Sequence, residues 1–239
     1  MIKLENLKKD LRKFERPEKE KIFIRYFKAG KGEYAEGDKF LGLKTGETRS
    51  VAARYKNIEY QDIKKLLASP IHEERICAVM ILVQRFEKGD TKIRKEVFEF
   101  YLKNLDGINN WDLVDISCPK IIGRYLYETG ESKKFFYTFA KSDNLWKRRI
   151  AMVSTFFYIK QNDFKDTLKI AEILLNDKHD LIHKAVGWML REIGNRDLGV
   201  EEEFLKKYYK KMPRTMLRYA IEKFDGEKRK QYLSKNSQL

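Results

Sequence analysis

A short pattern, a basic residue followed by a small residue and an apolar run, occurs in the C-terminal half of the chain as Lys184-Ala185-Val186-Gly187-Trp188-Met189. It returns as Arg75-Ile76-Cys77-Ala78-Val79-Met80, as Arg149-Ile150-Ala151-Met152-Val153 and as Arg218-Tyr219-Ala220-Ile221. The alanines at positions 78, 151, 185 and 220 are separated by 73, 34 and 35 residues, and the first gap is about two periods. A period of about 35 residues is typical of helical hairpins stacked in a HEAT-type α-solenoid, and it places a fifth unit near residue 115.

The spacing of apolar residues favours the same fold class. Apolar side chains return every three or four residues along most of the chain and rarely alternate with polar ones, which indicates helices and not strands. The sequence therefore predicts an all-α protein, with residues 1–239 forming a single domain. The one long irregular segment is expected from Ala29 to Thr48. Its glycines follow no predicted strand, so we expect a solvated or ligand-facing loop and not a phosphate-binding nucleotide loop.

The composition excludes several classes of protein. Hydrophobic residues make up 42% of the 239 residues, which is enough for a packed core and argues against global disorder. No apolar run is long enough to span a bilayer, and the charged N-terminal segment is not a signal-peptide core. We expect a protein of the bacterial-type cytosol, associated with the nucleoid when it acts and not with a membrane. Cys77 and Cys118 lie in apolar stretches and are expected to be buried free thiols.

The charge balance is the first indication of a partner. The chain has 51 Lys and Arg against 36 Asp and Glu, a net charge of +15, which attracts polyanions and above all nucleic acid. Equivalent positions of a solenoid line up through space, so Arg75, Arg149, Lys184 and Arg218 are expected to form one cationic row on its concave face, suited to a duplex backbone. The alternative is that these residues, and most of the surplus, are ordinary solvated surface charges. The neighbouring Glu73-Glu74-Arg75 is expected to form local ion pairs of little energetic weight.

The fifth unit departs from the repeat. Its sequence Asn110-Trp111-Asp112-Leu113-Val114-Asp115 places a carboxylate near the register that holds alanine in the other units. Trp111 and Asp115 are four residues apart, so on a helix they share one face. A carboxylate on the packed or concave side of a solenoid is costly unless it is paired or used. The alternative interpretation is that Trp111 belongs to the core and Asp115 accepts an ion pair from a neighbouring arginine.

The next two units carry Ser142-Asp143-Asn144-Leu145-Trp146 with Arg149, and Lys184-Ala185-Val186-Gly187-Trp188-Met189-Leu190-Arg191-Glu192. With these motifs, Trp111-Asp112-Leu113-Val114-Asp115, Arg25-Tyr26 and Phe40-Leu41-Gly42, the sequence resembles the AlkD-like DNA alkylation repair proteins, which are HEAT-repeat alkylpurine DNA glycosylases. The resemblance spans roughly residues 20–235, and the last motif is the most specific. The glycine-rich stretch before Phe40 is longer than the family pattern.

The resemblance implies roles for individual residues. Asp115 would be the catalytic carboxylate, and Trp111 and Trp188 would be aromatic walls against the deoxyribose and backbone of the substrate. Arg149 would grip DNA beside the lesion, and Tyr26 would be a further contact. With the cationic residues, the expected DNA-binding set is Arg149, Tyr26, Arg148, Lys184, Arg191, Arg75 and Arg218. The expected partner is double-stranded DNA containing alkylated purines, bound by a monomer without a pocket for an extruded base, which would tolerate bulky adducts.

The chemistry of the lesion suits this set of residues. A purine alkylated at N3 or N7 carries a positive charge and is already a good leaving group, so no general acid is required. A fixed anion near C1′ stabilises the oxocarbenium-like sugar as the bond breaks. Asp115 is suited to this role or to orienting the attacking water, and both roles remain open. No cofactor or metal is expected, because His179 and His183 are four apart but lack a third ligand.

Two other functions compete with the glycosylase. A non-catalytic HEAT-repeat protein that binds damaged or structured DNA would show salt-sensitive binding without base release. A protein-interaction scaffold, which is typical of HEAT solenoids, would present an exposed apolar groove and would not depend on Arg149.

Overall fold

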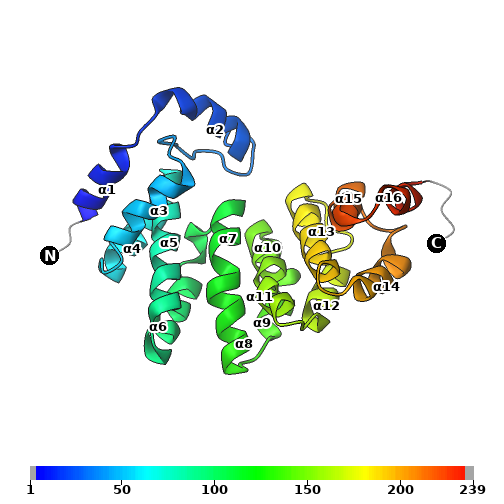
Figure 1. Ribbon diagram of the computed structural model, residues 1–239. Helices are drawn as coiled ribbons and strands as arrows, with labels where there is room; N and C mark the ends of the chain where they lie inside the picture. Colours follow the sequence, from blue (N-terminus) through cyan, green and yellow to red (C-terminus); the bar gives the residue numbers. More distant parts are fainter. Residues whose placement is uncertain (1–3, 235–239) are drawn as a thin grey trace. The chain divides into compact units, whose positions relative to one another are not determined.

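The computed structural model describes residues 4–234. Within this range the chain forms helices joined by short turns, and its only β-type pairing is an isolated bridge between Lys39 and Ile71 (Figure 1). Each helix packs against near neighbours along the chain, and the predicted fold class, an all-α solenoid of HEAT-like hairpins, is confirmed. No helix in the described range is long and apolar enough to cross a membrane.

The chain divides into two compact units, Met1–Ile121 and Ile122–Leu239, and each is described by itself. The helices of the first unit are α1 (Leu4–Arg12), η1 (Pro17–Lys19), α2 (Glu20–Phe27), α3 (Thr45–Arg54), α4 (Tyr60–Leu67), α5 (His72–Lys88), α6 (Thr91–Lys103), η2 (Leu105–Gly107) and α7 (Trp111–Cys118). Helix α5 lies at the centre of this unit and packs against α3, α4, α6 and α7 (Figure 1).

The boundary between the units falls within a π-helical turn, η3 (Pro119–Gly123). The second unit continues with α8 (Arg124–Thr129), α9 (Lys134–Ala140), α10 (Leu145–Ser154), α11 (Phe156–Lys160), α12 (Lys165–Ile173), α13 (Asp180–Gly194), α14 (Leu198–Tyr208), α15 (Arg214–Ala220), η4 (Ile221–Lys223) and α16 (Gly226–Leu233). Helix α13 is its centre and packs against α10, α12, α14 and α15.

The repeat alanines mark helices that occupy the core of their units. Ala78, Ala151, Ala185 and Ala220 lie on α5, α10, α13 and α15, and all four are fully buried. A small side chain at this register allows the neighbouring helix to approach closely, which is why the pattern recurs. The fifth unit predicted near residue 115 corresponds to α7.

Both cysteines are buried free thiols, as expected. Burial raises the pKa of Cys77 to about 12, so this thiol stays protonated at neutral pH. It behaves as a small apolar side chain of the α5 core.

The irregular segment is shorter than expected, because α3 already begins at Thr45. Glu47 fixes this start: its carboxylate accepts a hydrogen bond of 2.8 Å from the backbone N–H of Lys44. The same carboxylate receives a bidentate pair from Arg16, at 2.7 and 2.6 Å. Arg16 holds the pKa of Glu47 down at about 2, so the carboxylate is ionised over the whole neutral range.

Close packing against the α13 backbone accounts for two of its glycines. A Cβ on Gly187 would lie 2.4 Å from the carbonyl oxygen of Met216 on α15. A Cβ on Gly194 would lie 1.7 Å from Oε2 of Glu201 on α14. Glycine therefore lets α15 and the Glu201 carboxyl pack directly on the α13 backbone.

Glu201 is the most strongly perturbed carboxyl of the second unit. Its side chain is buried, and Oε1 has no hydrogen-bond partner in the structure. Burial, reinforced by the neighbouring Glu202, raises the pKa of Glu201 to about 8. The folded protein therefore keeps a proton on Glu201 at neutral pH, whereas the unfolded chain releases it near pH 4.5.

Because folding requires Glu201 to keep this proton, the folded state loses stability relative to the unfolded chain as the pH rises. The stability gained from a raised carboxyl pKa is complete below about pH 4.5 and is lost as the pH rises to about 8. We expect Glu201→Gln to stabilise the protein by about 2 kcal/mol at pH 8.5 and to give no gain at pH 4.5. Urea unfolding at both pH values measures the difference. The exposed neighbour Glu203→Gln is the control, and an equal gain at both pH values would contradict the assignment.

Candidate functional site

Helix α7 begins at a buried asparagine. The Oδ1 atom of Asn110 accepts the backbone N–H of Trp111 at 2.8 Å, and Asn110 itself is fully buried. The cap fixes where α7 starts and therefore which residues of its first turns face outward. Trp111 and Asp115, one turn apart, both line a cavity of about 510 Å³ in the first unit, which confirms that they share one face of the helix.

One wall of the cavity is aromatic. The Tyr26 and Trp111 rings meet edge to face, with centroids 5.6 Å apart. Phe27 stacks on Trp111 with a centroid distance of 5.5 Å and an interplanar angle of 20°. Phe23 completes the wall, and Tyr26 is 62% exposed although it lies among these rings. The cavity thus combines a π surface with the carboxyl groups of Asp112 and Asp115, a combination that suits a cationic group.

The floor of the cavity holds a buried histidine. The Nε2 atom of His72 lies 2.8 Å from Oδ2 of Asp112, and the residue is 2% exposed. Burial lowers the pKa of His72, but the attraction of the Asp112 carboxylate outweighs it, and contact with Asp38 adds to the effect. The pKa consequently rises to about 9, and His72 is an imidazolium at neutral pH.

Glu73 fixes the backbone conformation of the motif Phe40-Leu41-Gly42. Its carboxylate accepts three successive backbone N–H groups, those of Leu41 at 2.9 Å, Gly42 at 2.8 Å and Leu43 at 3.2 Å. Gly42 has φ +81°, and a Cβ there would lie 2.6 Å from the carbonyl oxygen of Arg16. The end of the glycine-rich segment is therefore a nest filled by a side chain of the protein itself.

Arg75 departs from the predicted cationic row. The side chain is buried, and its guanidinium donates to Asp38 Oδ2 at 2.5 Å and to the carbonyl oxygen of Ser69 at 2.7 Å. In this structure the two terminal nitrogens of Arg75 bind a carbonyl group and a buried carboxylate, so the side chain is not accessible, and its role as a DNA contact stays a prediction. Burial opposes the ionisation of Asp38, but contacts with His72 and Arg75 keep its pKa below the ordinary value.

Glu74 joins α5 to the N-terminal helix. Its buried carboxylate lies 3.1 Å from Lys8 Nζ and 3.6 Å from Arg12 NH1, both on α1. The expectation of weak local ion pairs in Glu73-Glu74-Arg75 is wrong, because all three residues are buried and bind groups distant in sequence. Such pairs are costly to break, since the remaining charge is left buried without a partner.

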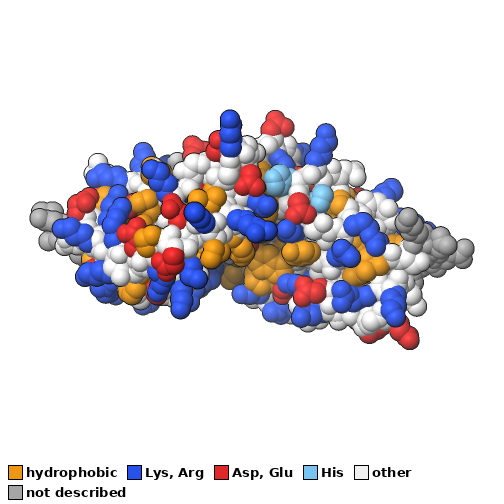
Figure 2. Space-filling view, turned by 90° about the horizontal axis from the view of Figure 1, so that it is seen from above, with side chains coloured by type: hydrophobic (Ala, Val, Ile, Leu, Met, Phe, Trp, Pro, Cys, Tyr) orange, Lys and Arg blue, Asp and Glu red, His pale blue; other side chains and the backbone are white. Residues whose placement is uncertain are grey.

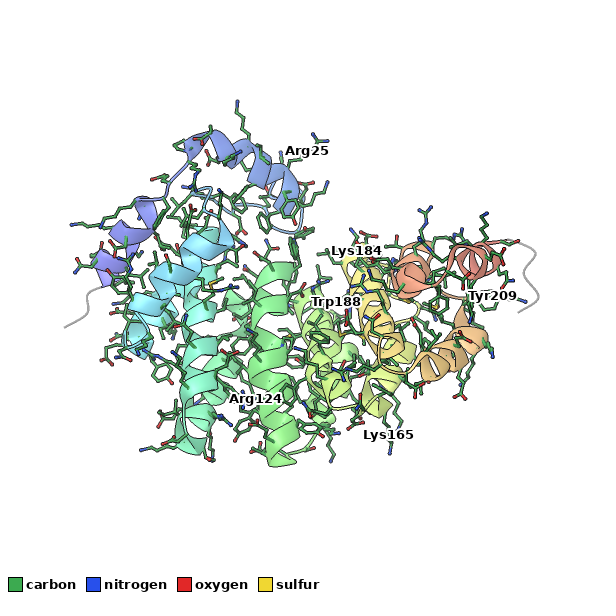
Figure 3. The ribbon with its side chains drawn as sticks, in the orientation of Figure 1. Arg25, Arg124, Lys165, Lys184, Trp188 and Tyr209 are labelled. Carbon is green, nitrogen blue, oxygen red and sulfur yellow. The ribbon has the colours of Figure 1, made fainter. Side chains whose placement is uncertain are left out.

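The second unit carries the other predicted aromatic wall. Trp188 extends from α13, where its Nε1–H donates to Glu192 Oε1 at 3.0 Å and its ring lies 5.5 Å from that of Phe156 (Figure 3). Lys184 lies one turn earlier on α13, and its Nζ pairs with Asp180 at 2.7 Å. The close contact at Gly187 holds this part of α13 against α15.

The remaining predicted DNA-binding residues differ in exposure. Arg149 is buried, and its NH1 donates to the carbonyl oxygen of Leu181 at 2.6 Å. Arg148 donates from Nε to Asp177 at 2.6 Å and to two carbonyl groups before α10. Arg191 pairs with Glu222, and Arg218 on α15 is exposed. The row of equivalent cations thus contains two buried arginines and two accessible side chains, Lys184 and Arg218.

Basic side chains also lie elsewhere on the surface. Figure 2 shows Lys and Arg side chains spread over the visible face of each unit, with carboxylates among them. The surplus charge is therefore not confined to one row on this face, and the concave cationic face stays a prediction.

The two histidines of the second unit have structural partners. His179 Nδ1 accepts the backbone N–H of Leu181 at 3.1 Å and so caps α13. His183 Nε2 lies 2.5 Å from the carbonyl oxygen of Asp177. Among residues 4–234 there is no group of three or more His, Cys, Asp and Glu side chains arranged to hold a metal ion.

His72, Glu73 and Asp38 are the site residues that sequence reasoning missed. The signal that was available is the run His72-Glu73-Glu74-Arg75, four ionisable residues directly before the apolar α5 core. A charged run at the start of a helix is normally exposed to solvent. Only the buried partners of these side chains, which the sequence does not reveal, distinguish this run from a solvated one.

Comparisons with known proteins agree with this architecture. A family model described as DNA alkylation repair enzyme matches residues 7–224. Among solved structures, the chain is similar to a protein described as a predicted DNA alkylation repair enzyme from Enterococcus faecalis, with a TM-score of 0.70 and 17% identity. That similarity covers 89% of this chain and 97% of the other, and at this identity it concerns the fold. No curated protein matches the chain.

The titration of His72 tests the electrostatics of the cavity. The chain has three histidines, so NMR of protein with ¹³C-labelled histidine resolves each one. We expect one signal with a midpoint near pH 9, absent in His72→Gln. Because the pKa is raised from 6.5, the stabilisation is complete below about pH 6.5 and is lost as the pH rises through 9. His179, whose pKa burial lowers, is the internal control. The absence of any midpoint above pH 8 would contradict the ionised pair.

Proposed function

Because the chain belongs to the family of DNA alkylation repair enzymes, we propose that it is a DNA glycosylase acting on cationic N3- and N7-alkylpurines in duplex DNA. It hydrolyses the N-glycosidic bond without a pocket for an extruded base. The observation that carries this proposal is the cavity in which Asp115 lies beside Trp111 and Tyr26.

Asp115 supplies the charge that the reaction needs. As the bond from C1′ to the charged purine breaks, positive charge moves from the base to the sugar, and a carboxylate about 4 Å away stabilises it. At an effective dielectric constant of about 20 this is worth on the order of 4 kcal/mol, or about three decades of rate. The leaving base departs as a neutral purine, so no side chain has to donate a proton to it.

Trp111 acts on the same sugar as Asp115 in this proposal. Trp111 is held by Phe27 and Tyr26, so its face is already oriented before DNA binds. An indole face against the cationic sugar adds about 0.5–2 kcal/mol. Trp188, oriented by Glu192 and Phe156, is the second indole of the proposal.

The DNA contacts divide into accessible and occupied side chains. Tyr26, Lys184 and Arg218 are accessible and are proposed to meet the backbone directly. Arg148, Arg149 and Arg191 bind protein carboxylates or carbonyl groups, so we propose that they reach DNA only by exchanging these partners for phosphate.

The glycosylase assignment is tested by base release. Purified protein is incubated in excess with duplex DNA containing N7-methylguanine, and the free base is measured in a single turnover. We expect Asp115→Asn to lower the rate by about a thousandfold, since it removes the anion. Asp62→Asn on α4, outside the cavity, is the matched control. Release that survives Asp115→Asn undiminished would reject the catalytic role, and binding without release by the wild type would favour a non-catalytic DNA-binding protein.

The contact surface is tested with a pair of lysines of the second unit. Lys184 lies at one end of the unit and Lys165 at the other (Figure 3). We expect Lys184→Ala to weaken binding to any duplex severalfold and to reduce the slope of log K against log salt by about 1, because one phosphate contact is lost. Lys165→Ala should change neither quantity. Equal effects of the two substitutions would show that charge and not position determines binding.

A further inference from the structure

His72 has partners on both sides of its ring and is not itself exposed to the cavity opening. Its Nε2 faces Asp112 of α7 at 2.8 Å. Its Nδ1 faces Asp38 of the loop before α3 at 3.5 Å and Arg75 of its own helix at 3.3 Å. The position of His72 is therefore fixed by three charged groups from three parts of the first unit.

The ring of His72 also supports the aromatic wall. Phe27 lies against it with a centroid distance of 4.5 Å, and Phe40 lies at 5.3 Å. Phe27 in turn stacks on Trp111, with centroids 5.5 Å apart. A single buried imidazole thus contacts both the first turn of α7 and the ring that backs Trp111.

We propose that His72 is a positioning residue: by donating Nε2–H to Asp112 and packing against Phe27, it fixes the first turn of α7 and thereby the placement of Trp111 and Asp115. The placement itself does not depend on the glycosylase assignment, whereas its effect on reaction rate rests on the proposed function. His72 contacts neither sugar nor base in this proposal and acts through the other two residues.

The chemistry of the two ring nitrogens supports this role. Nε2 faces a carboxylate and therefore donates in the imidazolium and in the neutral Nε2–H tautomer alike. Nδ1 has an acceptor in Asp38 and a donor in Arg75, so it is satisfied whether or not it carries a proton. The hydrogen bond to Asp112 is consequently kept in both protonation states of His72. The placement of α7 therefore depends on the presence of this donor and not on the charge of the ring.

Two substitutions of His72 separate the effect of its hydrogen bond to Asp112 from the effect of its packing against Phe27. Glutamine places an amide N–H near the position of Nε2 and retains the donor without the charge. Leucine keeps apolar bulk against Phe27 but leaves the buried Asp112 carboxylate without this donor, which is costly. The remaining charged groups facing the site, Asp38, Arg75, Glu73 and Asp115, are unchanged in both variants.

The first test needs no activity. Trp111 is made the only tryptophan by Trp146→Phe and Trp188→Phe, since the chain has three. In this background, His72→Leu is expected to shift the emission maximum of Trp111 and to increase its quenching by acrylamide at least twofold, whereas His72→Gln stays close to the parent. Thermal unfolding verifies that each variant is folded. An unchanged Trp111 signal in folded His72→Leu would overturn the proposal.

The second test measures the reaction. In single-turnover base release, His72→Leu is expected to lower the rate about ten- to a hundredfold with little change in DNA affinity, because a small displacement of reacting groups costs this much. His72→Gln should recover most of the rate. Equal loss in both variants, or a loss confined to affinity, would overturn the positioning role. If the wild type releases no base, the proposed function fails, and the Trp111 signal still decides the placement.

Discussion

The first unit depends on a buried set of charges at the start of α5. Four consecutive side chains, His72, Glu73, Glu74 and Arg75, are each no more than 3% exposed. They bind α7, the end of the glycine-rich loop, α1 and Asp38, respectively. Burying so many charges is costly unless every one is paired, and the positive end of the helix favours the two glutamates. One helix terminus therefore ties together parts of the chain that are far apart in sequence.

The candidate site takes its geometry from this set. Trp111 lies one residue from Asp112, the partner of His72, and Asp115 lies one turn further along α7. In the second unit, close backbone packing at Gly187 helps to hold α13 and Trp188 in place. In both units, polar contacts and close packing together orient the predicted residues: Trp111 also contacts Phe27, and Trp188 also donates to Glu192. These contacts fix the side chains before a ligand binds, which suits the proposed catalysis by preorganised charge.

The repeat shows which structural features a sequence period can predict and which it cannot. The register was correct, since Ala78, Ala151, Ala185 and Ala220 are all buried. The basic residues beside them do not share one environment, because Arg75 and Arg149 are buried while Arg218 is exposed. A period places residues at equivalent positions on successive helices. It does not specify which neighbouring loop or carboxylate covers each position.

The sequence alone determined the helical class, the repeat period and the shared face of Trp111 and Asp115. These features follow from contacts between residues close together in the chain, where helix geometry is sufficient. The tertiary structure decided that Glu73 fills the nest at Leu41-Gly42-Leu43 and that Asp38 binds both His72 and Arg75. These contacts join residues thirty or more positions apart through a loop that folds back on α5 and has no periodic pattern. Whether the charged run at the start of α5 is exposed to solvent or buried with partners is therefore decided only when the chain folds.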